Sequence, residues 1–151
     1  MTPSPFFKHQ MFASRLHLII GQYVKINNLG EVCFSPLDVI FDDGMHRFQP
    51  DLLFIRKENT SAIKDWIRIV PDMVCEIISP GSYERDTEVK KSVYEKNRVP
   101  EYWLVMPEIQ TIEILTIEGD KYKLHSMAAL DGAVTSKVIE GLIVNVKEIF
   151  E

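Results

Sequence analysis

The segment "VPDMVCEIISPGS", residues 70 to 82, constrains the fold most strongly, because it places an acid inside an otherwise apolar run. An apolar run of this length between Pro71 and Pro80 is typical of a strand buried on both faces of a sheet. A carboxylate inside such a strand costs free energy unless another group pairs with it. We therefore expect a specific partner for Glu76, and the rest of the sequence indicates which one.

The composition is that of one folded domain spanning residues 1–151. A chain of 151 residues with 46% apolar residues can bury a substantial core. Cys33 and Cys75 lie in apolar runs without the spacing of a zinc site, so we expect reduced core cysteines and a cytoplasmic protein. The apolar stretch "LHLIIGQYV" is too short to span a bilayer, and no membrane contact is expected.

The charge limits how the chain would bind nucleic acid. A net charge of -5 argues against broad electrostatic binding, because neutralising phosphates requires clustered lysine and arginine. Any nucleic acid would be held locally. Cations are concentrated only in "ERDTEVKKSVYEKNR", residues 84 to 98, where acids alternate with them. We interpret most of these cations as the solvated face of a helix.

The first half of the chain predicts one helix and several strands. Apolar residues recur every three to four positions over 9–26, as in an amphipathic helix. The segments 31–35, 37–43 and 46–55 are expected strands, with a turn at Asp43-Gly44 and Pro50 within the third. The polar stretch 56–65 is expected to be an exposed loop before the strand that carries Glu76.

The second half predicts a helix over 87–97, capped by Asp86 or Thr87 and ending before Pro100. Alternating segments at 101–106, 111–117 and 121–127 are expected strands, the last two joined by a turn at Gly119-Asp120. The tail 141–150 is a strand or a helix that covers the core. This order indicates an α/β fold with a mixed central sheet flanked by helices.

Two Pro-Asp pairs offer an acidic neighbour for Glu76. Asp72 lies four residues away on the same expected strand, roughly 13 Å at about 3.3 Å per residue, which is too far to share a metal ion. Asp51 lies on another expected strand, and adjacent strands are only about 4.8 Å apart. Asp51 and Glu76 can therefore converge on one divalent cation through oxygen ligands.

The helix after Glu76 offers a cation. Asp86, Lys90 and Tyr94 recur at four-residue intervals and form one stripe, beside Val89 and Val93, which we expect to face the core. A metal ion that activates water, together with a lysine that stabilises charge on phosphate, would make a phosphodiesterase site.

These residues carry a family resemblance over nearly the whole chain. The segments "QPDLLFI", "PDMVCEIISPGS" and "RDTEVKKSVYEKNRVPEYWLV" closely resemble the Uma-two family of restriction-endonuclease-like proteins, within the PD-(D/E)XK nuclease superfamily. The likeness extends to "HQ" at the start of the first helix, to "TIEILTIEGDKYKL" and to "GLIVNVKEIF". It implies a restriction-endonuclease-like core.

The resemblance also implies a site and an activity. Asp51, Glu76 and the backbone carbonyl of Ile77 would bind Mg²⁺ or Mn²⁺, and Lys90 would be the catalytic lysine in an endonuclease that cuts DNA. The commoner superfamily pattern places the lysine two residues after the glutamate, where this chain has Ile78. The resemblance further implies a homodimer, and an N-terminal segment with an "ELIDGEL"-like stretch that this chain, starting at "MTPSPFFKHQ", is expected to lack.

Two alternatives remain open at this stage. Glu76 could be a structural acid paired with Lys90 or Arg85, since ion pairs also place charges in sheets. The chain as a whole could be a catalytically silent domain of the same fold that binds protein or nucleic acid.

His9 could line the mouth of a site, while His17 is expected to be a half-exposed helix residue without a catalytic role. Of Tyr102 and Trp103, alternation predicts that one faces the core and the other a partner chain.

Overall fold

The computed structural model describes residues 7–42, 46–79 and 85–151. Its helices are α1 (Phe7–Ile26), α2 (Lys91–Lys96) and α3 (Val146–Phe150), with short 3-10 turns η1 (Lys57–Ala62) and η3 (Pro107–Ile109) and a π-helical turn η2 (Arg85–Lys90). Its strands are β1 (Gly30–Phe34), β2 (Val39–Ile40), β3 (Arg47–Phe48), β4 (Leu52–Arg56), β5 (Met73–Ile77), β6 (Glu101–Met106), β7 (Thr111–Glu118), β8 (Lys121–Ala129), β9 (Ala133–Thr135) and β10 (Ile143–Asn145).

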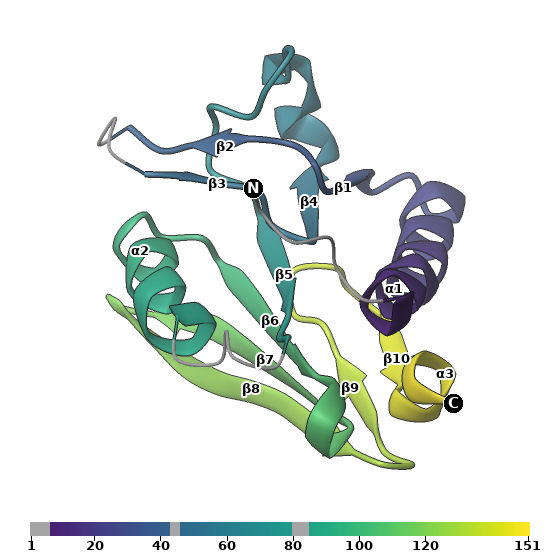
Figure 1. The fold of residues 1–151 in the computed structure, drawn as a ribbon. Helices are drawn as coiled ribbons and strands as arrows, with labels where there is room; N and C mark the ends of the chain where they lie inside the picture. Colours follow the sequence, from purple (N-terminus) through teal and green to yellow (C-terminus); the bar gives the residue numbers. More distant parts are fainter. Residues whose placement is uncertain (1–6, 43–45, 80–84) are drawn as a thin grey trace.

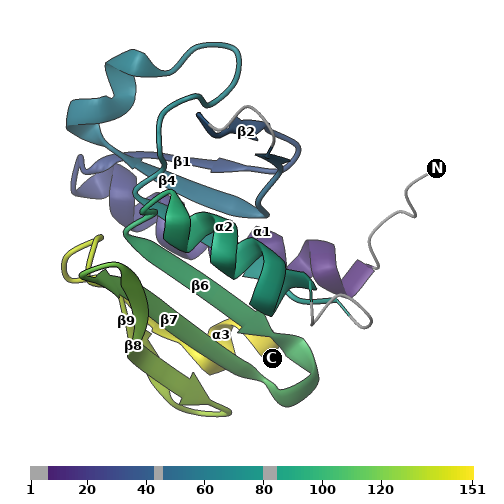
Figure 2. The same ribbon diagram turned by 90° about the vertical axis from the view of Figure 1, so that its left-hand side faces the viewer.

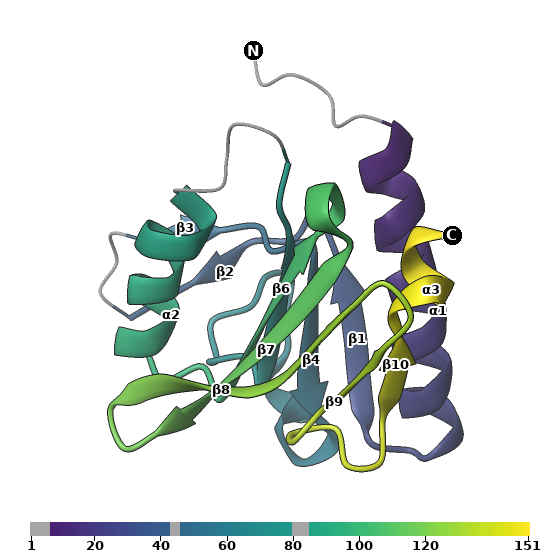
Figure 3. The same ribbon diagram turned by 90° about the horizontal axis from the view of Figure 1, so that it is seen from below.

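A six-stranded mixed sheet in the order β1-β4-β5-β6-β7-β8 forms the centre of the molecule. Its neighbours pair antiparallel except β5 and β6, which run parallel. A parallel pair needs a crossover connection, and η2 and α2 lie within it. Helices α1 and α3 cover one face of the sheet, and α2 with the β2–β3 pair covers the other (Figures 1 and 3). The expected α/β fold with a mixed sheet flanked by helices is confirmed.

The sheet separates two apolar cores. Alternate residues of β5 divide between them: Cys75 and Ile77 pack toward α1, whereas Val74 packs toward α2. In β6, Trp103 packs toward α1 and Tyr102 toward α2. Both of these rings are fully buried. The expectation that one of the two faces a partner chain was wrong, because helices cover both faces of the sheet at β6.

The amphipathic pattern of α1 correctly predicted its buried face, which consists of Phe12, Leu16, Ile20 and Val24. The last helix, α3, closes this core beside α1 (Figure 3). The rings of Phe12 and Phe150 meet edge to face at 5.2 Å, and Arg15 donates a hydrogen bond of 2.7 Å to the carbonyl of Ile149. The tail 141–150, which was expected to be a strand or a helix, contains both, the strand β10 and the helix α3.

Several expected elements differ in detail. The expected strand 46–55 is two strands, β3 and β4, because the ring of Pro50 between them has no N–H for a ladder. The expected loop 56–65 contains the exposed turn η1. The hairpin between β7 and β8 is confirmed, and Gly119 has a φ of +65°, which glycine adopts without strain. The turn at Asp43-Gly44 lies outside the described residues.

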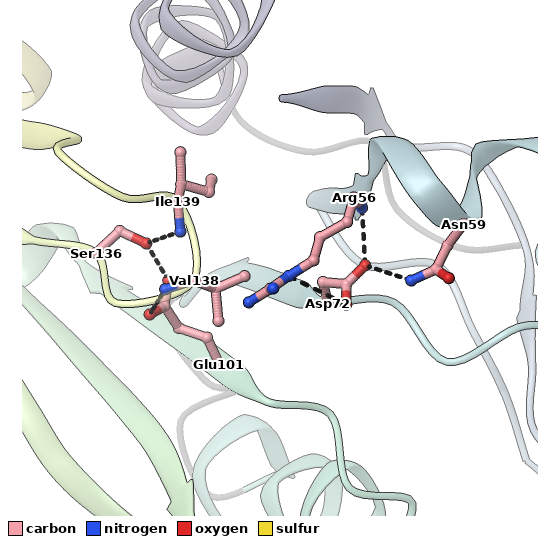
Figure 4. A network of polar contacts seen from close by, with 7 residues as sticks. All are labelled: Arg56, Asn59, Asp72, Glu101, Ser136, Val138 and Ile139. Carbon is pink, nitrogen blue, oxygen red and sulfur yellow. Dashed lines mark hydrogen bonds and ion pairs between the residues drawn. The ribbon is translucent and has the colours of Figure 1, made fainter. Parts of the chain in front are cut away.

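A buried glutamate that the sequence analysis did not single out anchors the second half of the chain. Glu101, with 0% exposure, begins β6 and accepts hydrogen bonds from Trp103 Nε1 (2.8 Å) and Ser136 Oγ (2.6 Å). The backbone N–H groups of Lys137 and Val138 also donate to it, at 2.8 and 3.2 Å. Figure 4 shows this carboxyl group meeting the Ser136–Ile139 segment. Glu101 thus fixes the chain that leads from β9 toward β10.

We predict that Glu101→Ala lowers the free energy of unfolding by about 3 kcal/mol or more, because it leaves several buried donors without an acceptor. Urea denaturation measures the change. Glu118→Ala, at the exposed end of β7 in the same sheet, is the matched control and is expected to change stability by less than about 0.5 kcal/mol. Equal small effects for both variants would contradict the anchoring role.

Candidate active site

Asp51 and Glu76 meet where β4 and β5 lie side by side. The antiparallel register pairs Leu52 with Cys75, so continuing it by one residue places Asp51 opposite Glu76. Side chains opposite each other on adjacent strands share a face. The Ile77 N–H donates a hydrogen bond of 2.7 Å to Asp51 Oδ2, which fixes the aspartate against the end of β5. The structure therefore brings together the two acids that the sequence analysis paired.

The cost of burying Glu76, with 3% exposure, is offset by groups from the crossover helix. Tyr94 Oη donates a hydrogen bond of 2.7 Å to Glu76 Oε1. Lys90 Nζ lies 3.3 Å from the same oxygen and 5.9 Å above the ring centre of Phe48. One carboxylate oxygen thus receives both a phenol hydrogen bond and an ammonium charge. Lys90, one of the two cations considered for Glu76, pairs with it.

Lys90 reaches Glu76 from a helix that changes form at that residue. The segment 85–90 is a π-helical turn, and Lys91 continues as α-helix. The helix therefore begins before the predicted caps Asp86 and Thr87, while the Asp86 side chain lies outside the described part of the chain. Because a π-turn spaces side chains differently from an α-turn, Val89 is 53% exposed whereas Val93 is buried. The expected core position of Val89 was wrong, although Lys90 and Tyr94 still converge.

His9 completes the contacts of Asp51. It lies in the first turn of α1, with Nε2 3.4 Å from Asp51 Oδ1, and both side chains are mostly buried. Its Nδ1 is buried without a hydrogen-bond partner among the described residues. The hydrogen bond to Asp51 raises the pKa of His9, the charges of Asp51 and Glu76 and the backbone of Ile77 add to this rise, and burial opposes it. The sequence analysis placed His9 only at the mouth of a site and did not predict its contact with Asp51. Residue spacing along the chain does not show that α1 packs next to Asp51.

The second Pro-Asp pair has a structural role at the other end of β5. Asp72 Oδ2 accepts the backbone N–H of Arg56 at 2.8 Å and the Asn59 amide at 3.5 Å. Its other oxygen lies 3.7 Å from Arg56 Nε (Figure 4). These contacts tie the start of η1 to β5. Asp72 therefore stabilises a turn that lies apart from Asp51 and Glu76.

The chemistry of the donors at the site suits a hard divalent cation. Asp51 and Glu76 supply carboxylate oxygens and Ile77 adds a backbone carbonyl, which are the ligand types that Mg²⁺ and Mn²⁺ prefer. Within the described ranges, no three His, Cys, Asp or Glu side chains are grouped so that they could hold one ion. A cation bound here would therefore rely on two carboxylates and on non-side-chain oxygens. The ligand roles of the three residues remain predictions.

Two cavities are lined in part by His9 and lie at the edge of the candidate site. One, of about 410 Å³, reaches from His9 and Asp51 along α1 to Phe34. The other, of about 710 Å³, is lined by Lys8, Ile77 and Ser79 among others. The first cavity therefore reaches Asp51, and the second reaches Ile77.

No helix within the described ranges combines the length and apolar character needed to cross a membrane.

A family model described as "Uma2: Putative restriction endonuclease" matches residues 1–147. No curated protein matches the chain. A crystal structure described as a putative nuclease belonging to DUF820, from Anabaena variabilis, superimposes with a TM-score of 0.81. Its sequence is 21% identical, and the match covers 99% of this chain and 84% of that one, so the two share a fold.

We predict a pH-dependent contribution of His9 to stability. A folded-state pKa above 6.5 means that the ion pair with Asp51 contributes fully below pH 6.5 and is lost as the pH rises through the folded pKa. In EDTA, His9→Gln should therefore lower the unfolding free energy at pH 6, by about 1 kcal/mol at most, and change it little at pH 9. Denaturant unfolding at both pH values measures this, with exposed His125→Gln as the matched control. A larger loss at pH 9 would contradict the ion pair.

Proposed function

Because the chain belongs to the Uma2 family, described as "Putative restriction endonuclease", we propose that it is a metal-dependent endonuclease that hydrolyses phosphodiester bonds of DNA. The observation that carries the proposal is the convergence of Asp51, Glu76 and Lys90, with Lys90 Nζ 3.3 Å from Glu76. Two acids on adjacent strands and a lysine from the crossover helix are the groups that such a reaction needs. The proposal includes action in the cytoplasm, consistent with two free cysteines, and assembly as a homodimer.

Asp51, Glu76 and the carbonyl of Ile77 would hold Mg²⁺ or Mn²⁺. A bound cation of this kind acts as a Lewis acid on phosphate and lowers the pKa of its water. Asp51 is oriented for this role by the Ile77 N–H, and Glu76 by the hydroxyl of Tyr94. These contacts fix the direction of both carboxylates before substrate arrives, which reduces the cost of ordering them in the reaction.

Lys90 would stabilise the negative charge that develops on phosphate during attack by water. The position two residues after Glu76 cannot supply this cation, because Ile78 packs in the apolar core beside α2. Lys90 reaches the same carboxylate from the helix, and its ammonium lies between Glu76 and the ring of Phe48. A phosphate bound next to Glu76 would contact the Lys90 ammonium, which is already in position and would need little rearrangement.

The alternative function is a catalytically silent domain of the same fold that binds protein or nucleic acid. It is favoured by the way each acid is already compensated: Glu76 by Lys90 and Tyr94, and Asp51 by His9. In that case the contacts at the site are purely structural. Metal binding and cleavage separate the two functions.

We predict that the parent protein binds Mn²⁺ and that Asp51→Asn and Glu76→Gln each weaken binding at least tenfold, because each removes a charged oxygen ligand. Isothermal titration calorimetry measures this, with circular dichroism as the test of folding. Asp72→Asn is the matched control, since Asp72 also follows a proline but holds Arg56 and Asn59, and it should leave Mn²⁺ affinity unchanged. A parent protein that binds no Mn²⁺ would rule out the metal-dependent reaction.

We predict that Lys90→Met lowers the rate of DNA cleavage in Mn²⁺ by about 100-fold or more while Mn²⁺ affinity is retained, because the lysine stabilises charge on phosphate and does not bind the ion. Cleavage of plasmid and single-stranded DNA measures the rate. Lys96→Met, at the exposed end of α2, is the control and should cut at the parental rate. Unchanged cleavage by folded Lys90→Met would exclude this role, and no cleavage by the parent in any metal would favour the silent domain.

A further inference from the structure

We propose that the 410 Å³ cavity beside Asp51 binds an unpaired nucleobase of the DNA strand, next to the phosphodiester to be cut; this inference rests on the proposed function. We call this cavity the His17–Phe34 pocket. It is lined by the outer face of α1, through Gln10, Ser14 and His17, and by Phe34 at the end of β1. Its volume lies in the range of about 300 to 1,000 Å³ typical of pockets for small organic groups.

The pocket contains an exposed aromatic surface that the fold does not use. Phe34 is 60% exposed, although it ends a strand of the central sheet. The His17 ring meets it edge to face, with ring centres 4.7 Å apart and an interplanar angle of 73°. This contact packs one side of the phenyl ring while most of the residue remains in solvent. Solvent-exposed aromatic rings are the platforms on which proteins commonly stack unpaired bases.

The position of the pocket suits a base whose phosphate lies at the acids. Asp51 belongs both to the pocket lining and to the candidate active site. A nucleotide whose base contacts Phe34 would therefore place its backbone toward Asp51. The exposed side chains of Gln10 and Ser14 offer hydrogen-bond donors and acceptors to the edge of that base.

The same geometry favours a base that is not paired. A base inside a duplex presents only its edges, so its face cannot contact Phe34 unless the nucleotide leaves the stack. The net charge of -5 also provides little general attraction for a duplex backbone. Affinity would therefore come from local stacking, which single-stranded or unpaired nucleotides allow. The substrate class that follows is DNA with single-stranded or unpaired nucleotides.

The test measures binding without cleavage. A single-stranded oligonucleotide carrying the fluorescent base 2-aminopurine is titrated with protein in EDTA, and fluorescence quenching and anisotropy are followed. Phe34→Ala should weaken binding by about 5- to 100-fold and abolish quenching, and Phe34→Trp should restore both. Leu124→Ala, an exposed apolar residue on β8 at the opposite edge of the sheet, should bind like the parent. Circular dichroism verifies the fold of each variant.

Each contrary outcome has a distinct meaning. Parental binding by folded Phe34→Ala, or equal parental affinity for single-stranded and fully paired DNA, would overturn the pocket assignment even if the parent cuts DNA in Mn²⁺. Sedimentation could show instead that Phe34→Ala changes the protein from dimer to monomer and leaves DNA binding unaltered. That result would assign the pocket to a second copy of the chain and overturn the proposal. Phe34-dependent binding by a parent that never cuts DNA would support the pocket and refute the endonuclease.

Discussion

The burial of a carboxylate in the middle of the sheet is the constraint on which the rest of the structure depends. Glu76 is surrounded by the apolar residues of β5, and water cannot stabilise it there. Its compensation comes from Lys90 and Tyr94, which belong to the crossover between the two parallel strands. The crossover must therefore do more than connect β5 to β6, because its first turns have to present two polar groups to one carboxylate oxygen.

Four of the acids with buried or part-buried contacts, Asp51, Asp72, Glu76 and Glu101, differ in where their partners come from. Asp72 accepts a backbone N–H at a turn and Glu101 accepts two, so in each the carboxyl group stabilises a backbone path. Figure 2 shows β6, which Glu101 begins, passing beneath α2. Glu76 and Asp51 differ in that their charged partners, Lys90 and His9, come from helical segments beside the sheet. Replacing Lys90 or His9 by a ligand would break no backbone hydrogen bond, whereas displacing the donors of Asp72 or Glu101 would.

The sequence predicted the features that depend on local periodicity, and missed those that depend on distant contacts. The apolar run of β5 correctly predicted a strand buried on both faces, and the three-to-four-residue spacing in α1 located its buried face. Strand pairing placed Asp51 beside Glu76, because strand spacing is the same in every sheet. The anchor at Glu101 was missed because its donors in Ser136, Lys137 and Val138 lie 35 to 37 residues later. The contact of His9 was missed because α1 and Asp51 meet only in the tertiary fold. The exposure of Val89 reflects a π-turn that apolar spacing does not reveal.

The docking of α3 against α1 has a consequence for how the chain reaches its final state during synthesis. Helix α1 emerges first among the described elements and α3 last, yet the two cover the same face of the sheet. Until α3 is made, the aromatic ring of Phe12 and the neighbouring apolar surface remain open, and a chaperone that recognises such surface would bind there. His9 stands one turn before Phe12 on α1, so its contact with Asp51 lies next to this surface. Until α3 is in place, α1 lacks its contacts with Ile149 and Phe150, so the helix that carries His9 is held less firmly beside Asp51.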